Sequence, residues 1–263
     1  MFAIYKKELR SFFINPIGYV FVGAFLGLAA LLCCYTTILS GSYDTTSYFT
    51  VLLFAIGILV PLLTMRLFAE ERKLRTEQLL LTAPVSITGM VLGKFFAALT
   101  LYGGSLLVSC INFIPLYAIS AAEYDAKNTL FHQQALAANT TPVDITDHIG
   151  PVSGVILGNL VGILLVGAAL IAIGTFISAL TENQLAAAVV TISVSVLLLG
   201  LGLVNNLINS YPVRVVISWI SIYSRYGNFQ NGLFDFAAIL YYASISFAFV
   251  FLTVRVYEKR RWN

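Results

Sequence analysis

Six long stretches without a charged residue most constrain what this chain can fold into. They occupy residues 11–43, 45–65, 95–122, 149–181, 183–213 and 236–254. A helix needs about 20 predominantly apolar residues to cross the hydrocarbon core of a membrane, and each stretch has roughly that length. The stretches are continuously apolar instead of alternating, which indicates helices and not a barrel. The sequence therefore predicts an all-α integral membrane protein with six transmembrane helices.

The composition leaves no room for a folded soluble domain beside these helices. Of the 263 residues, 59% are hydrophobic and 10% are charged, whereas soluble domains average about 45–50% apolar and about 25% charged residues. We expect one membrane domain over residues 1–263, with an outer loop at 120–152. Its spans are expected at about 17–39, 47–66, 93–119, 153–180, 185–204 and 236–256.

The distribution of basic residues predicts the orientation. With six spans, twelve of the fifteen Lys and Arg residues fall on the side of the two termini, and only Lys127, Arg214 and Arg225 fall opposite. The positive-inside rule then makes both termini and the loop at 66–94 cytoplasmic, in a multi-pass protein of the cell membrane. The first apolar run is too long for a signal peptide, so we expect it to be a retained span.

An amphipathic helix is expected at Phe2–Ile14, ahead of the first span. Its aromatic and leucine residues recur at helical spacing, while Lys6, Lys7 and Arg10 occupy another face. Pro16 ends it, because the residue before a proline disfavours the α region. Such a helix lies in the membrane interface. The alternative is that these residues are only the charged start of the first span.

A dense charged segment at 66–84 separates the second and third spans. Its seven charged residues are Arg66, Glu70, Glu71, Arg72, Lys73, Arg75 and Glu77. They are followed by three leucines, Leu79, Leu80 and Leu81, and then by Pro84. Such a segment must lie in water at the membrane surface. Because it also exposes consecutive leucines, we expect it to dock onto another protein.

Two further segments connect spans in the second half. A tight cytoplasmic turn between the fourth and fifth spans is expected at Thr181, Glu182, Asn183 and Gln184. On the outer side, residues 205–235 have polar ends and an apolar centre. This pattern favours a short helix in the outer leaflet, with Trp219 and Tyr223 at the depth of the headgroups. The alternative is an ordinary surface loop.

The sequence predicts no catalytic residues and no metal site. The phosphate-binding pattern GxxxxGK[ST] is absent, as are GxSxG and HExxH, so we expect neither a nucleotide site nor an enzyme. His132 and His148 lie among acidic residues, but their spacing matches no metal-ligand pattern, and a solvated loop is favoured. Cys33, Cys34 and Cys110 lie inside spans, where cysteine is usually a small hydrophobic residue; a path for a soft metal is the alternative.

The middle of every predicted span lacks an acid or a base. Carriers driven by protons or ions usually need such groups there. Lys94 and Glu182 are close to span ends, and we expect them to reach the interface. If the chain moves a solute, the energy would therefore enter from outside the chain, most naturally at the segment 66–84.

Three short motifs resemble those of the ABC-2 type transporter permeases, in particular the group that includes the gliding-motility permease subunit. The cytosolic segment resembles the pattern E-E-R-K-x-G-T-x-E-L-L-L-T-x-P, with Arg75 in place of glycine and Gln78 in place of glutamate. The turn resembles G-x-F-x-S-x-L-T-x-N-Q at Gly174, Phe176, Ser178, Leu180, Thr181, Asn183 and Gln184. The outer segment resembles N-F-x-x-G-x-x-D at Asn228, Phe229, Gly232 and Asp235.

The resemblance implies the architecture of type V exporters: an elbow helix, six spans, a coupling helix between spans two and three, and short outer-leaflet helices between spans five and six. It also implies partners, namely a second permease chain in a homo- or heterodimer and two separate ATPase subunits, which hold ATP and Mg; no cofactor is expected in this chain and no nucleic acid. The implied ATPase-docking residues are Glu70, Glu71, Arg72, Arg75, Thr76, Glu77, Leu79, Leu80, Leu81 and Pro84. Among them we expect the leucines to fill a groove on the ATPase, with Glu71, Arg72 and Glu77 pairing around its rim.

Small residues at four-residue spacing are candidates for helix contacts. Gly23-x-x-x-Gly27 in the first span and Gly158-x-x-x-Gly162 in the fourth both allow close backbone approach. We expect Gly23 and Gly27 at the dimer interface, whereas the glycines of the fourth span fit a dimer or packing within one protomer.

The resulting functional hypothesis is the permease subunit of an ATP-binding cassette transporter, an exporter. Two alternatives stay open. One is an ABC-type complex that transmits ATP-driven motion to a partner without moving a solute. The other is a carrier or channel outside this family.

Overall fold

The structure is a computed structural model that describes residues 2–78, 86–137, 150–205, 208 and 210–262. Every regular element within those ranges is helical. Along the chain they are α1 (Phe2–Ile14), α2 (Pro16–Cys33), η1 (Cys34–Ile38), α3 (Thr46–Thr64), α4 (Arg66–Lys73), α6 (Ile87–Ser109), η2 (Cys110–Asn112), α7 (Phe113–Ala137), α8 (Ser153–Leu180), α9 (Gln184–Val204), α10 (Tyr211–Ile220), α11 (Ile222–Gln230) and α12 (Phe236–Trp262).

Six helical segments in the described ranges are long and apolar enough to cross a membrane. They are Pro16–Ile38, Thr46–Lys73, Ile87–Gln134, Ser153–Leu180, Gln184–Val204 and Phe236–Arg261. The prediction of an all-α protein with six spans is confirmed.

The helices form an elongated bundle around α8. Over their most apolar stretches α8 and α3 are each 67% buried inside the protein, whereas α2 and α12 are 28% buried. Helix α8 packs against α3, α6, α9 and α12 as well as against α4 and α11. The side chains of the outer helices that point away from α8 are apolar and exposed, as expected for surfaces that face lipid.

Helix α1 covers the same residues as the amphipathic helix that the sequence predicts, and it is separate from α2. Asn15 adopts an extended backbone with ψ of 145°, and Pro16 begins α2. The chain turns tightly here: a Cβ atom on Gly18 would lie 2.1 Å from the carbonyl oxygen of Phe12. Helix α1 packs on α6, where the Tyr5 hydroxyl lies 3.1 Å from the Thr100 hydroxyl.

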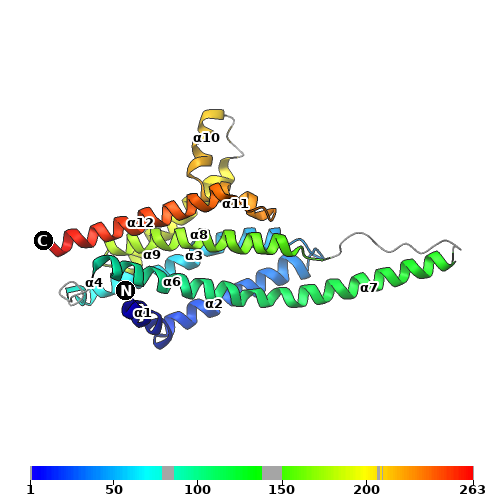
Figure 1. Cartoon of the computed structure of the whole chain (residues 1–263), viewed down its shortest axis with the longest axis horizontal. Coiled ribbons are helices and arrows are strands. Elements are labelled where there is room, and N and C mark those ends of the chain that lie inside the picture. Colours follow the sequence, from blue (N-terminus) through cyan, green and yellow to red (C-terminus); the bar gives the residue numbers. More distant parts are fainter. Residues whose placement is uncertain (1, 79–85, 138–149, 206–207, 209, 263) are drawn as a thin grey trace.

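The third span differs from the expectation at its outer end. The sequence predicts a loop from residue 120, but α7 continues as a helix to Ala137 and extends beyond the bundle (Figure 1). Residues in this extension favour a helix, and Lys127 pairs with Glu123 at 2.6 Å in the i, i+4 arrangement that supports one. The loop prediction was wrong because polarity alone does not end a helix. Residues 138–149, including His148, lie outside the described residues.

Both chain termini lie at one end of the bundle, together with α4 and the turn between α8 and α9 (Figure 1). We call this end the terminal face. Helix α10 projects sideways from the bundle (Figure 1), while α11 packs against α8 and α9. We call the contact of α11 and the following turn, residues 231–235, with the start of α8 the outer corner. The segment 205–235, expected to contain one short helix, thus contains two, with Trp219 68% exposed on α10.

Candidate functional site

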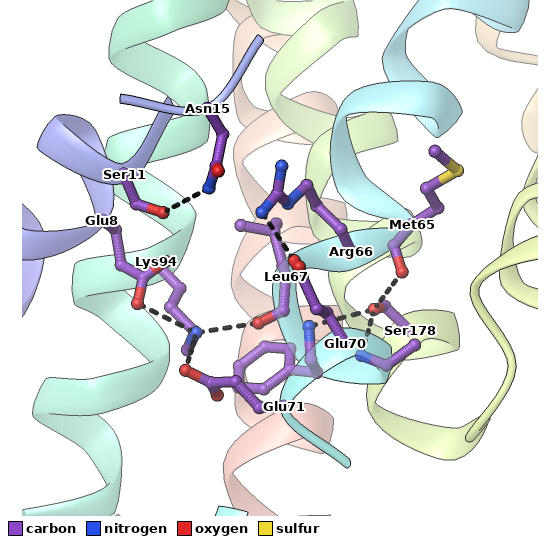
Figure 2. Close-up of polar contacts among 12 residues, drawn as sticks. Glu8, Ser11, Asn15, Met65, Arg66, Leu67, Glu70, Glu71, Lys94 and Ser178 are labelled. Carbon is purple, nitrogen blue, oxygen red and sulfur yellow. Dashed lines mark hydrogen bonds and ion pairs between the residues drawn. The ribbon is translucent and has the colours of Figure 1, made fainter. Parts of the chain in front are cut away.

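The terminal face brings the charged segment after α3 against the turn after α8, two segments about 110 residues apart in sequence. Ser178 of α8 makes the central contact. Its hydroxyl oxygen accepts hydrogen bonds from the backbone N–H groups of Phe68 (3.2 Å) and Ala69 (3.1 Å), and it donates to the carbonyl of Met65 (3.0 Å). The first N–H groups of a helix lack partners inside that helix. Ser178 therefore caps the start of α4 from a different helix (Figure 2).

Two arginines extend this contact. Arg72 donates to the carbonyl of Leu180 (3.1 Å) and pairs with Glu182 at 2.7 Å. Arg260, near the end of α12, donates to the carbonyl of Ala179 (2.7 Å) and pairs with Glu77 at 3.1 Å. Because the last carbonyls of a helix also lack partners inside it, both guanidinium groups satisfy the C-terminus of α8 while holding an acidic residue. The turn itself is closed by Asn183, whose side chain accepts from the N–H of Leu185 at 3.0 Å and caps α9.

A buried cluster of ionised groups joins α4 to α1 and α6. Lys94 of α6 has a side chain that is 1% exposed, and its Nζ atom lies 2.9 Å from Glu71 of α4 and 3.1 Å from Glu8 of α1. It also donates to the carbonyl of Leu67 at 2.8 Å and lies over the ring of Phe68 (Figure 2). A buried ammonium group is tolerated only with such a set of partners. Lys94 therefore connects three elements through one nitrogen.

The prediction for Lys94 was wrong about the direction in which its side chain points. The sequence predicts that this lysine reaches the membrane interface, but its side chain turns into the protein, because two carboxylates and a carbonyl surround its ammonium group there. Glu8 and Arg260 were missed as site residues for the same reason. No local sequence signal marks them, because Glu8 stands among the basic residues of α1 and Arg260 in the basic end of α12, and their partners are far away in sequence.

A cavity of about 480 Å³ lies between α1, α4 and α6, beside this cluster. Arg66 lines it and pairs with Glu70 at 2.7 Å, with a side chain that is 9% exposed. Lys7, whose side chain is 61% exposed, lies at the mouth of the cavity, 3.8 Å from both Glu8 and Glu71. Charged groups of both signs thus line a space that opens toward water.

The predicted docking residues fall into three groups. Glu71, Arg72 and Glu77, expected on a rim that faces a partner, form ion pairs within this chain, and so does Glu70. The exposed residues of the described segment are instead Lys73, Leu74, Arg75, Thr76 and Gln78. The remaining predicted docking residues, Leu79, Leu80, Leu81 and Pro84, lie outside the described residues.

The backbone conformation of Arg75 explains why the family pattern has glycine at this position. Its φ of +55° lies in the left-handed region, and it is the one non-glycine residue with positive φ in the described part of the chain. Glycine adopts this conformation without cost, which accounts for the glycine that is common at this place in the pattern. Arg75 keeps the turn that follows α4 at the cost of local strain.

The candidate glycines of α2 and of α8 have different surroundings in the structure. A Cβ atom on Gly23 or Gly27 would meet nothing within 4 Å, so this face of α2 is open. By contrast, a Cβ on Gly158 would lie 2.8 Å from Gly232, and one on Gly162 would lie 2.8 Å from Tyr226. The glycines of α8 therefore serve packing within the protomer.

Comparison with known proteins now gives the class of this protein. A family model described as an ABC-2 family transporter protein matches residues 35–256. The chain belongs to this family and is a multi-pass permease component of an ABC transporter, a class whose ATPase subunits are its partners. No curated protein sequence matches the chain at a significant level. Membership of the gliding-motility group stays a prediction.

Proposed function

We propose that this permease is the membrane subunit of an exporter, and that separate ATPase subunits dock on its terminal face and drive it. The terminal face is then cytosolic and holds both chain termini. The observation that carries the proposal is the anchoring of the charged segment to four helices. Glu71 pairs with Lys94 of α6 and lies 3.8 Å from Lys7 of α1. Ser178 attaches the segment to α8, and Glu77 attaches it to α12.

Such anchoring supports a coupling role in physical terms. A helix that touched one neighbour would move by itself when pushed, whereas a segment tied by short charged contacts to several helices displaces them together. These contacts within the chain leave the side chain of Leu74 64% exposed. The segment is followed in sequence by the three leucines that we propose as anchors in the ATPase groove. Buried apolar anchors usually dominate such interfaces.

Leu80→Asp tests the docking site. It should dissociate the permease from its ATPase, or uncouple ATP hydrolysis from the permease, and both are measured by co-purification and ATPase assay of the complex. The matched control is Leu233→Asp, because Leu233 is 62% exposed at the opposite end of the molecule. Leu233→Asp should leave co-purification and stimulated ATPase activity unchanged. If both also survive Leu80→Asp, the segment is not the docking site.

The orientation has its own test. Single cysteines at Arg75 and Lys127, introduced into a chain without Cys33, Cys34 and Cys110, should differ in intact cells. An impermeant thiol reagent is expected to label position 127 and not position 75. Labelling of position 75 from outside would overturn the cytosolic assignment of the terminal face.

We further propose that two permease chains pair through the open face of α2 that contains Gly23 and Gly27. Gly27→Leu should weaken the pair and leave the protomer folded, because a side chain there meets nothing inside the protomer. Native mass spectrometry measures the ratio of dimer to monomer. An unchanged ratio would remove this face from the interface.

One observation favours a second function, transmission of ATP-driven motion to a partner without movement of a solute. Helix α7 extends beyond the bundle at the end opposite the terminal face (Figure 1), with Leu130 56% and Phe131 54% exposed. Phe131→Asp separates the two functions in cells. An exporter keeps its activity with this variant, whereas a complex that acts through the extension of α7 loses it.

A further inference from the structure

Arg66 carries a hydrogen-bond donor that the protein does not use. Its Nη2 atom pairs with Glu70 at 2.7 Å, but its buried Nη1 atom has no hydrogen-bond partner within the part of the chain that the structure describes. The side chain is 9% exposed. Guanidinium groups have five N–H donors in a fixed plane, and a buried donor without an acceptor is costly. This side chain therefore points to an acceptor that the described part of the chain does not supply.

Arg66 lines the 480 Å³ cavity between α1 and α4, and its unused donor is a buried atom of this side chain. Figure 2 shows the guanidinium group on the side that faces Ser11 of α1 and Asn15, which links α1 to α2. Both side chains line the same cavity, and the Asn15 amide nitrogen donates a hydrogen bond to the Ser11 hydroxyl at 3.4 Å. The second N–H of that amide, the Ser11 hydroxyl and the Arg66 guanidinium group can each donate to a ligand in the same space.

The acidic residues that line this cavity are balanced by basic ones. Glu70 is paired with Arg66, while Glu71 and Glu8 share Lys94 at 2.9 and 3.1 Å and Lys7 at 3.8 Å. The three carboxylates are therefore offset by three cations within the protein. An anion that enters the cavity therefore meets carboxylates whose negative charge is offset by neighbouring cations.

A second hollow makes the approach to the cavity positive. It has a volume of about 540 Å³ on the outer side of α1, and Lys7 and Ser11 line both spaces. Lys6 and Arg10 also line it, and none of its lining residues is acidic. Together the two hollows have five basic and three acidic side chains. An anion is therefore attracted along α1 toward Arg66.

We propose that the cavity between α1 and α4 is a binding site for a phosphate group, with Arg66 Nη1 as its innermost donor. A planar guanidinium group matches the oxygens of a phosphate, and hydroxyl and amide donors complete such sites. Two sources carry this chemistry, the headgroup of an anionic phospholipid and soluble phosphate. The position of α1 favours the lipid, because Phe2 and Phe13 are 75% and 47% exposed beside its basic residues, as in helices that lie in a membrane interface.

The experiment uses the purified full-length permease without ATPase, so its result does not depend on the proposed docking site. Native mass spectrometry measures retention of phosphatidylglycerol and of phosphatidylcholine, and inorganic phosphate is added as a competitor. The wild-type protein should retain phosphatidylglycerol in preference to phosphatidylcholine. Arg66→Gln should weaken that binding about tenfold or more, because a hydrogen bond to a charged group is lost. The matched control, Arg214→Gln, removes an exposed arginine from α10 and should change nothing.

A second variant guards against misfolding of Arg66→Gln, which also leaves Glu70 without its partner. Arg66→Lys keeps the charge and one donor for Glu70 but loses the planar fork, and it should weaken binding as well. Binding of inorganic phosphate that depends on Arg66, in the absence of lipid preference, would support the site with soluble phosphate as its ligand. If the wild type and both Arg66 variants all retain phosphatidylglycerol and phosphatidylcholine equally, the proposal is overturned.

Discussion

The two ends of the molecule hold their helices together by different chemistry. At the terminal face the contacts are ionic: Lys94 joins three elements, and Arg72 and Arg260 attach α4 and α12 to the end of α8. At the outer corner the contacts between α8 and α11 are neutral. Tyr226 donates a hydrogen bond to Asn159 in the interior, and Gly158 lets the turn after α11 touch α8.

The difference follows from where each end lies relative to lipid. Ionised groups are expensive inside a bilayer, so a corner in the outer leaflet, where we propose that this one lies, is best held by close backbone approach and by uncharged hydrogen bonds. At a surface that borders water, ion pairs are possible, and at the terminal face they tie the charged segment to its neighbours. We therefore expect elements that move together at the terminal face and a rigid corner at the outer end. Each of the following predictions tests one side of this comparison.

The largest effect is expected from Lys94→Met. It leaves Glu8 and Glu71 largely buried without their shared cation, and breaking a buried ion pair in this way costs about 3–5 kcal/mol. Thermal unfolding of the purified permease in detergent measures the loss.

The matched control is Lys127→Met, which breaks an ion pair whose side chains are 49% and 40% exposed. Such exposed pairs contribute about 0–1 kcal/mol. Equal losses for the two variants would show that the cluster around Lys94 contributes no more than a surface pair.

At the outer corner the largest expected effect comes from Gly158→Ala. The added Cβ atom would lie 2.8 Å from the Cα atom of Gly232 and 2.9 Å from the carbonyl oxygen of Phe229, so backbone must move. Overpacking of this kind costs about 1–3 kcal/mol. The control on the same helix is Gly154→Ala, where a Cβ meets nothing within 4 Å and alanine should be neutral or stabilising. A neutral result for Gly158→Ala would mean that the corner is not rigid.

The smallest effect is a pH dependence at the same corner. Asn228 donates to Asp235 at 2.9 Å, and the N–H of Ala237 donates to it at 2.8 Å, which holds the pKa of Asp235 below its ordinary value. Because the folded pKa is the lower one, the stabilisation is fully present above the ordinary pKa of an aspartate, near 4, and is lost as the pH falls through the lowered value. Hydrogen exchange at the start of α12 should therefore rise in that acidic window. Asp235→Asn should abolish this rise, and a rise that persists in the variant would assign it to another group.

Several local features could be predicted because they depend on neighbours in sequence. The break between α1 and α2 follows from Pro16, which restricts the residue before it wherever the chain folds. The outer motif is also local: Asn228 and Asp235 bind each other across the turn, and Gly232 between them has φ of +73°. By contrast, the role of Ser178 was not predictable, since its partners lie about 110 residues away.

Sequence alone determined the membrane class, the six spans and the family. A charge-free stretch of about 20 residues has no other stable environment than a bilayer, whatever surrounds it. Only the tertiary structure decided which polar groups are buried and which glycines are open. Lys94 turns inward because helices distant in sequence bring two carboxylates to it. Gly27 faces open space while Gly162 faces Tyr226, although both belong to the same sequence pattern. Local sequence patterns show which polar side chains and glycines a segment contains, and tertiary packing decides which partners they contact.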